Sequence, residues 1–272
     1  MTDEAADQVR GFDPRVPNEA RVLDFMMGGK DNFAADRKAA AEILEFAPEI
    51  PMMIRESRKF LARTVRYLAE HGVRQYVDIG CGLPTQGSVH QILEPIAPES
   101  KVVYVDNDPV VIVHSNALID TTGTIRVVQA DVREPDALLD HPVVAAHIDL
   151  KEPTAIVVQS VFTTILDDAL VARTIQRLAD RLATGSYLLF SHAVGDPPDA
   201  DTAKLADLFH QHYLLEGDRT EPRTRAEVAR FLTGLDLVPP GLVPMPAWRP
   251  LPGEPTVDPD SFWAIGGIAR KP

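Results

Sequence analysis

Three aspartates placed at or near the ends of short apolar runs are the clearest sign of chemistry in this chain. Asp78 lies within "YVDIGCG", Asp106 ends "KVVYVD", and Asp131 follows "TIRVVQA". If each run is a strand of one parallel sheet, the three carboxylates meet along one rim. Open α/β sheets bind their ligands at this rim, outside the carboxyl ends of the strands.

Two glycines directly after the first run indicate a turn that approaches a ligand. Gly80 and Gly82 can adopt backbone conformations that are closed to other residues. The dinucleotide fingerprint G-x-G-x-x-G would require a third glycine where Thr85 stands. Asp78 also adds negative charge where a dinucleotide would place its phosphates. The turn therefore favours a nucleotide-type ligand that carries a cation, such as an amine or a sulfonium.

The second and third aspartates suit the sugar and the base of such a ligand. Asp106 follows Gly80 by 106 − 80 = 26 residues, and an acid at that strand end can accept both hydroxyls of a ribose. Asp131, or the backbone of Val132, could meet the exocyclic amine of an adenine. Structural explanations exist beside these, because an aspartate also stabilises turns and begins helices.

The elements that must position these residues follow an alternating pattern from residue 73 onward. Five apolar runs, each followed by a helical segment, begin at "RQYVDIG", "KVVYVDND", "TIRVVQAD", "TAIVVQSV" and "GSYLLFSHA". These runs are rich in β-branched residues and nearly continuously apolar, which is typical of strands covered on both faces. Two further runs, "LDLV" and "SFWAIGGIAR", suit a hairpin-like pair. The pattern predicts an α/β doubly wound, mostly parallel, Rossmann-like sheet of seven strands, the last antiparallel.

Helices are expected before the first strand. "AADRKAAAEILEFA" and "RESRKFLARTVRYLAEHG" have apolar residues at helical spacing, and Gly72 is well placed to end the second. We expect an N-terminal helical cap over residues 1–72 and the main α/β domain over residues 73–272.

Composition excludes several other kinds of protein. The chain has 27 basic and 40 acidic residues, a formal net charge of −13, so nucleic acid is a poor candidate partner. The single cysteine and the absence of a signal-like N-terminus lead us to expect a cytoplasmic protein. No apolar segment approaches the roughly 20 residues that span a membrane. The oligomeric state cannot be read from the sequence.

The motifs resemble those of class I methyltransferases that use S-adenosylmethionine. Asp78-Ile79-Gly80-Cys81-Gly82 is similar to their first motif, Asp106 to the ribose-binding acid and Asp131 to the adenine-side acid. More narrowly, "GGKDNFAADR", "VDIGCGLPTQGSVH", "VVYVDNDPVV" and "VPMPAWRP" resemble a bacterial, largely actinobacterial family of these enzymes, over essentially the whole chain. The resemblance implies S-adenosylmethionine as cofactor, bound by Asp78, Gly80, Cys81, Gly82, Asp106, Asn107, Asp131 and Val132.

The segment "MMGGKDNF" has two explanations. The double glycine can end one short helix before Asp31 or Asn32 starts the next. Alternatively the segment is a lid, as helices before the first strand commonly are in this class. Lys30 would then pair with the methionine carboxylate of the cofactor, while Asn32 and Phe33 would face the ligand.

Two departures from the resembled family concern the substrate side. Tyrosines often occupy the positions of Leu23 and Phe25 in that family, and a histidine often occupies the position of Thr163. Any role of those groups in substrate binding is therefore in doubt in this chain.

The remaining candidates for catalysis are few. His192 ends "LLFSHA", where it could act as a base or orient a substrate, or could simply bond to the following loop. Cys81 could be a nucleophile at a helix N-terminus, but no histidine accompanies it and the turn needs a small residue there. His210 and His212 lie on different sides of a helix, so no metal site is predicted.

These features predict methyl transfer to the O, N or C nucleophile of a small molecule. A non-catalytic protein that binds S-adenosylmethionine or its demethylated product is the first alternative, and a nicotinamide-dependent oxidoreductase is the second. The cofactor carries the reactive chemistry in methyl transfer, so the sequence indicates the cofactor far better than the acceptor.

Overall fold

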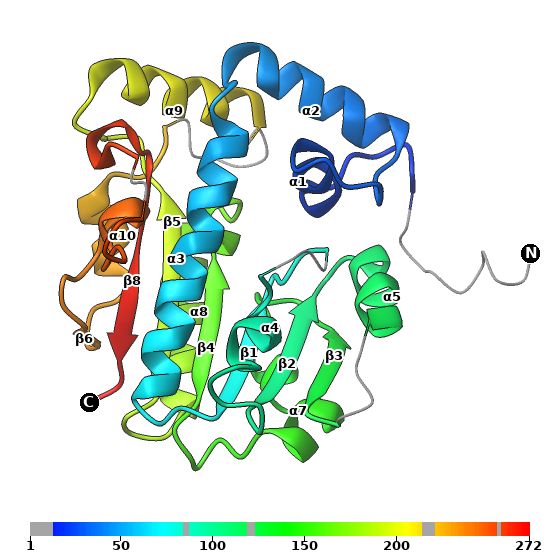
Figure 1. Ribbon diagram of the computed structural model, residues 1–272, viewed down its shortest axis with the longest axis vertical. Coiled ribbons are helices and arrows are strands. Elements are labelled where there is room, and N and C mark those ends of the chain that lie inside the picture. The colour runs from blue at the N-terminus through cyan, green and yellow to red at the C-terminus, as the bar shows by residue number, and fades with distance from the viewer. Residues whose placement is uncertain (1–12, 84–86, 119–122, 214–220, 255–256) are drawn as a thin grey trace, which may run out of the picture.

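A mixed sheet forms the centre of the computed structural model, which describes residues 13–83, 87–118, 123–213, 221–254 and 257–272 (Figure 1). Eight strands of these residues have the spatial order β3-β2-β1-β4-β5-β8-β6, and β7 pairs with β8. Strands β1 to β5 are parallel, and β8 is antiparallel to β5. The strands are Gln75–Ile79 (β1), Lys101–Asp106 (β2), Ile125–Gln129 (β3), Ala155–Gln159 (β4), Tyr187–Ala193 (β5), Asp236–Leu237 (β6), Val243–Pro244 (β7) and Ala264–Arg270 (β8). The predicted doubly wound, mostly parallel α/β sheet is confirmed.

The number of strands differs from the prediction by one. The segment "LDLV" supplies β6, which pairs antiparallel with β8 as expected. The extra strand, β7, lies in the proline-rich connection, where Val243 pairs with Gly266 and Pro244 with Ile265. A proline is tolerated in a strand at the margin of a sheet, where its missing N–H breaks no ladder. Two residues are too few to show an alternating pattern, so the sequence does not reveal this strand.

Helices cover both faces of the sheet, which explains the nearly continuous apolar runs. All five residues of β1 are buried. On one face, α3 (Ile50–Glu70) packs against the sheet through Phe60 and Leu68, in one cluster with Tyr76 of β1. On the other face, α8 (Asp168–Arg181) packs through Ile175 and Leu178. Helix α3 therefore shares its core with the sheet, although it lies within the predicted N-terminal cap.

Short helices complete the strand-to-helix alternation along the chain. Ser88 occupies the N-cap of α4, so this helix begins only after the turn that follows β1. The others follow the remaining strands or lie between them. These elements are Val89–Leu93 (α4), Pro109–Leu118 (α5), Pro135–Leu139 (α6), Pro142–His147 (α7), Ala200–Tyr213 (α9) and Arg225–Arg230 (α10), with short 3-10 turns at Val161–Thr163 (η2), Met245–Ala247 (η3) and Pro259–Ser261 (η4).

Two helices, α1 (Glu19–Met26) and α2 (Ala34–Phe46), lie beyond the carboxyl ends of the parallel strands (Figure 1). Asn18 starts α1 by accepting a hydrogen bond from the Ala20 amide, which satisfies one of the free donors of the first turn. The following helix, α3, ends at Glu70, and Gly72 takes the left-handed conformation with φ +86°. Gly72 thus ends α3 as predicted.

No helix in the described part of the chain is long and apolar enough to cross a membrane.

Candidate cofactor-binding site

A cavity of about 470 Å³ lies at the carboxyl ends of β1, β2 and β4. It is lined by α1 and α3, by the turns that follow the parallel strands, and by the chain near β7 and β8. The predicted site residues that line it are Asp78, Gly80, Cys81, Gly82, Asp106, Asn107, Asp131, Val132 and Thr163. The predicted residues that do not line it are Lys30, Asn32, Phe33 and His192.

The turn after β1 is built around its two glycines. Gly80 and Gly82 have φ angles of +68° and +64°, which favour glycine strongly. A Cβ atom on Gly80 would lie 2.3 Å from Cγ2 of Val161, so this position also lacks room for any side chain. The Gly80 amide donates to the carbonyl oxygen of Val105 at 2.8 Å, which fixes the turn beside β2.

Asp106 fastens this turn to the end of β2. Its Oδ2 accepts a hydrogen bond from the Gly82 amide at 2.9 Å, and its Oδ1 accepts one from the Asp108 amide at 3.0 Å. Burial raises the pKa of Asp106, and these two amides oppose the rise. Because a carboxylate oxygen can accept more than one hydrogen bond, both oxygens keep acceptor capacity toward the cavity. Asp106 can therefore hold the turn and accept ribose hydroxyls together.

Asp78 is the most strongly perturbed acid of the cavity. Its side chain is buried, and burial raises its pKa to about 7, a rise that nearby Asp106 increases and Arg58 opposes. No residue in the described part of the chain donates a hydrogen bond to its carboxylate. A buried carboxylate without a donor is poorly stabilised in its charged form. A bound cation would supply the missing partner, so Asp78 fits the ammonium of the predicted cofactor.

Asp131 has a different environment from the other two aspartates. Its carboxylate pairs with the Arg133 guanidinium and accepts from the Arg133 amide at 2.9 Å. The hydrogen bond from the Arg133 side chain is the main cause of its lowered pKa. Asp131 and Val132 still line the cavity. The adenine-side role of both residues remains a prediction.

Cys81 lies in the turn, but its thiol is poorly suited to nucleophilic chemistry. Burial raises its pKa well above the ordinary value, and the charges of Asp78 and Asp106 raise it further. A thiol with a raised pKa holds little thiolate near neutral pH, and the thiolate is the nucleophile. The geometry agrees with the interpretation of Cys81 as a small residue that the turn requires.

His192 does not face the cavity, contrary to the expectation that it could reach the crevice. Alternate residues of a strand point to opposite faces, and Ala193 lines the cavity while His192 points to the α8 side. There its ring lies between Phe190 and Phe231, and its Nε2 is 3.0 Å from Nη1 of Arg223. Its Nδ1 is 2.5 Å from the carbonyl oxygen of Ala193. His192 is therefore a buried, hydrogen-bonded residue of the strand end.

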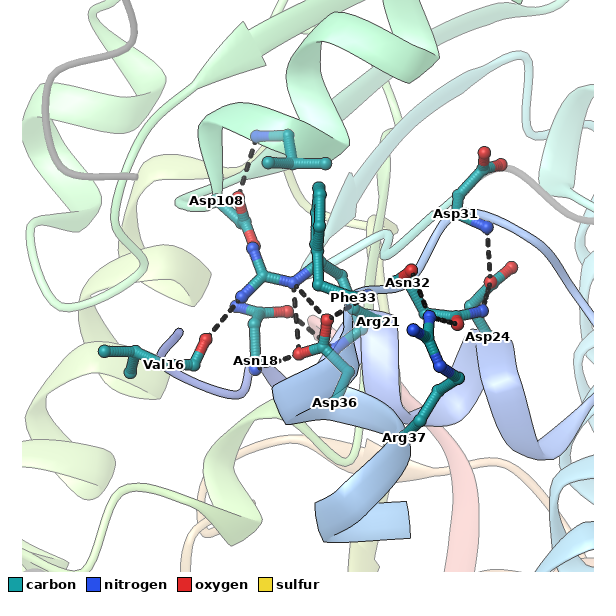
Figure 2. Close-up of polar contacts among 12 residues, drawn as sticks. Val16, Asn18, Arg21, Asp24, Asp31, Asn32, Phe33, Asp36, Arg37 and Asp108 are labelled. Atoms are coloured by element: carbon teal, nitrogen blue, oxygen red, sulfur yellow. Dashed lines mark hydrogen bonds and ion pairs between the residues drawn. The ribbon is translucent and has the colours of Figure 1, made fainter. Parts of the chain in front are cut away.

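The segment that contains Lys30, Asn32 and Phe33 forms a turn around Asp24 of α1 (Figure 2). Oδ2 of Asp24 accepts from the Asp31 amide and from Nδ2 of Asn32, both at 2.9 Å. A Cβ atom on Gly29 would lie 1.9 Å from Oδ1 of Asp24, which explains the second glycine of "GGKDNF".

The three residues of that segment that were predicted to contact the ligand do not line the cavity. Lys30 is exposed, and Phe33 is 37% exposed with the Arg21 guanidinium 5.5 Å from its ring centre. The side-chain amide of Asn32 donates hydrogen bonds to Asp24 and to the carbonyl oxygen of Gly29. The side chains of Asn32 and Phe33 therefore build the connection between α1 and α2. Thr163 does line the cavity, and its Oγ1 accepts from the Ala193 amide at 3.2 Å.

A buried ion network, which the sequence did not reveal, joins these helices to the sheet (Figure 2). Arg21 of α1 pairs with Asp36 of α2 at 3.1 Å and with Asp108 at 3.5 Å. Asp108 caps α5 through the Val110 amide, and its own amide donates to Asp106. The network therefore connects the two helices to Asp106, the acid that the sequence predicts to bind the ribose. The "AADR" sequence contains Asp36, but nothing local identifies its partner 15 residues earlier.

No group of three or more His, Cys, Asp or Glu side chains that could hold a metal ion occurs among the residues whose placement is described. The side chains of His210 and His212 lie outside the described residues.

The sheet order and the cavity together define a class of protein. Parallel strands in the order β3-β2-β1-β4-β5, extended by an antiparallel strand, place a glycine turn and two buried aspartates at one rim. These features are those of a Rossmann-like methyltransferase that binds S-adenosylmethionine. The chain belongs to the family of S-adenosyl methyltransferases, whose sequence model matches residues 5–272. It is therefore an S-adenosylmethionine-dependent methyltransferase.

Solved structures of similar sequence come from actinobacteria. A DUF574-family protein from Streptomyces avermitilis is 34% identical, with a TM-score of 0.85 over 96% of this chain and 99% of that one. A candidate methyltransferase from Thermobifida fusca is 37% identical, with a TM-score of 0.85 over 96% and 97%. Human N-acetylserotonin methyltransferase, solved with S-adenosylmethionine, is 15% identical with a TM-score of 0.50 over 98% and 65%, and shares the fold alone. No curated protein matches this chain in sequence.

Proposed function

We propose that this enzyme methylates an O, N or C nucleophile of a small, largely apolar molecule. The observation that carries the proposal is the division of the cavity into an acidic part beside β1 and β2 and an apolar part beside α1 and α3. The apolar part is lined by Leu23, Met26, Met27, Ile43, Ile50, Met53, Ile54, Leu61, Met245, Phe262 and Trp263. Such walls suit an apolar acceptor, since apolar surface is stabilised when it leaves water.

The residues of the acidic part would hold the cofactor. The ionised carboxylate of Asp78 would bind the ammonium, and Asp106 would accept the ribose hydroxyls. S-adenosylmethionine, when bound, supplies a methyl group on a sulfonium that an in-line nucleophile displaces. The protein then has to align the acceptor and exclude water. The apolar walls of α1 and α3 would perform both tasks.

Most polar groups near the apolar part are neutral, and the charged exceptions are Asp24 of α1 and Arg58 of α3. Ser57, Gln159, Thr163 and Thr164 line the cavity, and no histidine does so among the described residues. Hydroxyl and amide groups orient an acceptor through hydrogen bonds but do not remove a proton near neutral pH. We infer that the acceptor reacts through a nucleophile that loses its proton to water or already carries a free lone pair.

A transfer assay with methyl-labelled S-adenosylmethionine would test the proposal. Small apolar compounds that carry a hydroxyl, an amine or a nucleophilic carbon would be screened with the wild type and with Asp106→Asn. We expect label in at least one acceptor, with a KM for the cofactor about 10-fold or more higher in the variant, because a charge-assisted hydrogen bond to the ribose is weakened.

One observation favours a second function, a non-catalytic protein that binds the cofactor. His192 is turned away from the cavity, and Thr163 stands where the resembled family often has a histidine. Binding of S-adenosylmethionine without transfer to any acceptor in the screen would support this function. Membership of the methyltransferase family gives no support to the nicotinamide-dependent alternative.

A further inference from the structure

One face of α3 forms a wall of the cavity and carries a single charged residue. The residues of this face recur at intervals of three and four, as expected of one side of a helix. They are Ile50, Met53, Ile54, Ser57, Arg58 and Leu61. Arg58 is the one basic side chain among the described residues that line the cavity. Its position within an apolar helix face is unusual for an arginine, which is costly to bury without a partner.

Arg58 also differs from its neighbours in its partners. Arg63, on the same helix, donates to the carbonyl oxygens of Trp248 and Met245 and pairs with Glu254. Lys59 pairs with Glu56 at 2.8 Å. Arg58 makes no hydrogen bond or ion pair with any residue in the part of the chain that the structure describes, and it is only half-buried. Its donors are therefore available to a ligand.

Arg58 and Asp78 line the same cavity without touching. No nitrogen of Arg58 lies within 4.0 Å of an oxygen of Asp78, so the two do not form an ion pair. Their charges nevertheless interact, because Arg58 lowers the pKa of Asp78 against the effect of burial. The cavity thus has a cation on α3 and a carboxylate on β1, and the two groups are too far apart to form an ion pair with each other.

The cofactor of this family carries a group with matching charges. The methionine end of S-adenosylmethionine has an ammonium and a carboxylate on the same carbon. Four aspartates line the cavity among the described residues, so a carboxylate that enters it requires a cation. The planar guanidinium of arginine matches a carboxylate with two parallel hydrogen bonds. Lys30, which the sequence suggested for this role, is exposed and outside the cavity.

We propose that Arg58 and Asp78 hold opposite ends of the amino acid group of S-adenosylmethionine, with Arg58 on the carboxylate and Asp78 on the ammonium. This assignment rests on the proposed function, which requires S-adenosylmethionine as cofactor, and it adds Arg58 to the residues that would bind this cofactor. It also accounts for the position of a lone arginine within the apolar face of α3.

Calorimetric titration of the full-length protein tests the assignment with three ligands. S-adenosylmethionine carries both charged groups, its decarboxylated form lacks the carboxylate, and 5′-methylthioadenosine lacks the whole amino acid end. We expect Arg58→Gln to weaken S-adenosylmethionine roughly 10- to 100-fold, as loss of a charge-assisted pair does. Affinities for the other two ligands should stay within about 3-fold of the wild type.

Three further variants separate the effects of the two charges from general effects on binding. Asp78→Asn should weaken both ligands that carry the ammonium and spare 5′-methylthioadenosine. Arg55→Gln is the matched control, since Arg55 lies one turn earlier on α3, is exposed and does not line the cavity. Its affinities should equal those of the wild type. Arg58→Lys should restore part of the affinity for S-adenosylmethionine, because it keeps the charge and loses the planar fork.

Three results would overturn the assignment. Arg58→Gln could bind S-adenosylmethionine as tightly as the wild type. It could lose affinity equally for all three ligands, which would indicate a structural defect. It could keep cofactor affinity but raise the KM for the acceptor, which would place an acceptor anion at Arg58. Failure of the wild type to bind S-adenosylmethionine would instead contradict the proposed function itself.

Discussion

At the scale of single residues, the raised pKa of Asp78 makes the stability of the ligand-free protein depend on pH. Its pKa rises from 3.8 to about 7, so the folded state binds an extra proton between these values. The free energy of unfolding should therefore fall as pH rises through this window. The groups that face Asp78 are Arg58, which opposes the shift, and Asp106, Cys81 and Tyr104.

This linkage predicts that Asp78→Asn stabilises the ligand-free protein at pH 8, whereas the proposed contact with the ammonium predicts that it weakens cofactor binding. The ionised carboxylate costs about 4 kcal/mol at that pH if the full shift applies. Part of the gain is offset because the buried amide also needs partners, so we expect about 2 kcal/mol. Urea denaturation at pH 8 and pH 4 measures the difference. At pH 4, where the wild-type carboxyl is protonated, the amide should leave the variant about 2 kcal/mol less stable than the wild type, and an equal difference at both pH values would contradict the linkage.

At the scale of elements, the connection of α1 and α2 to the sheet depends on the Arg21 network. Arg21 is buried and forms ion pairs with Asp36 and Asp108, which are buried as well. Removing one partner of a buried ion pair leaves an uncompensated charge, which typically costs 3–5 kcal/mol. Since the Asp108 amide also donates to Asp106, loss of this network should also disturb the position of Asp106, the predicted ribose-binding acid.

We therefore expect Arg21→Met to destabilise the protein by about 3 kcal/mol and to speed amide hydrogen exchange in α1 and α2 more than in β1. Cofactor affinity should fall as well. Arg15→Met is the control, because Arg15 forms an exposed pair with Asp13 and exposed pairs contribute little. If the two variants lost similar amounts of stability in urea denaturation, the network would not hold these helices.

The elements also show what sequence patterns can and cannot reveal. The five parallel strands and the last antiparallel strand were predictable, because continuous apolar runs and turn residues are local signals. The orientation of His192 follows from strand alternation, since Ala193 takes the opposite face. The two-residue strand β7 carries no such signal. The predicted boundary at residue 72 stays a prediction, although α3 packs in one core with the sheet.

At the scale of the whole molecule, the cavity has the same acidic balance as the chain, whose net charge is −13. Four aspartates and one arginine line it among the described residues, namely Asp24, Asp78, Asp106, Asp131 and Arg58. S-adenosylmethionine has a net positive charge, whereas S-adenosylhomocysteine is neutral overall. The field of the protein should therefore favour the cofactor over its demethylated product, which helps product release.

Salt should weaken this preference. Raising NaCl from about 20 mM to about 500 mM shortens the screening length several-fold, so we expect the Kd of S-adenosylmethionine to rise roughly 3- to 10-fold. The Kd of S-adenosylhomocysteine should change by less than about 2-fold. Calorimetry at pH 8, where Asp78 is ionised, compares the two ligands. Equal salt dependence for both would show that the charge of the cavity does not discriminate between them.

The sequence by itself determined the sheet, the glycine turn and the aspartates at the strand ends. These features depend on the residue types of short segments, and parallel strands bring their carboxyl ends to one rim in every such sheet. Only the tertiary structure decided which helix faces meet that rim. It placed Arg58 in the cavity, Lys30 outside it, and Arg21 between Asp36 and Asp108. Those placements depend on how α1, α2 and α3 pack against strands far away in the chain, and no local pattern encodes that packing.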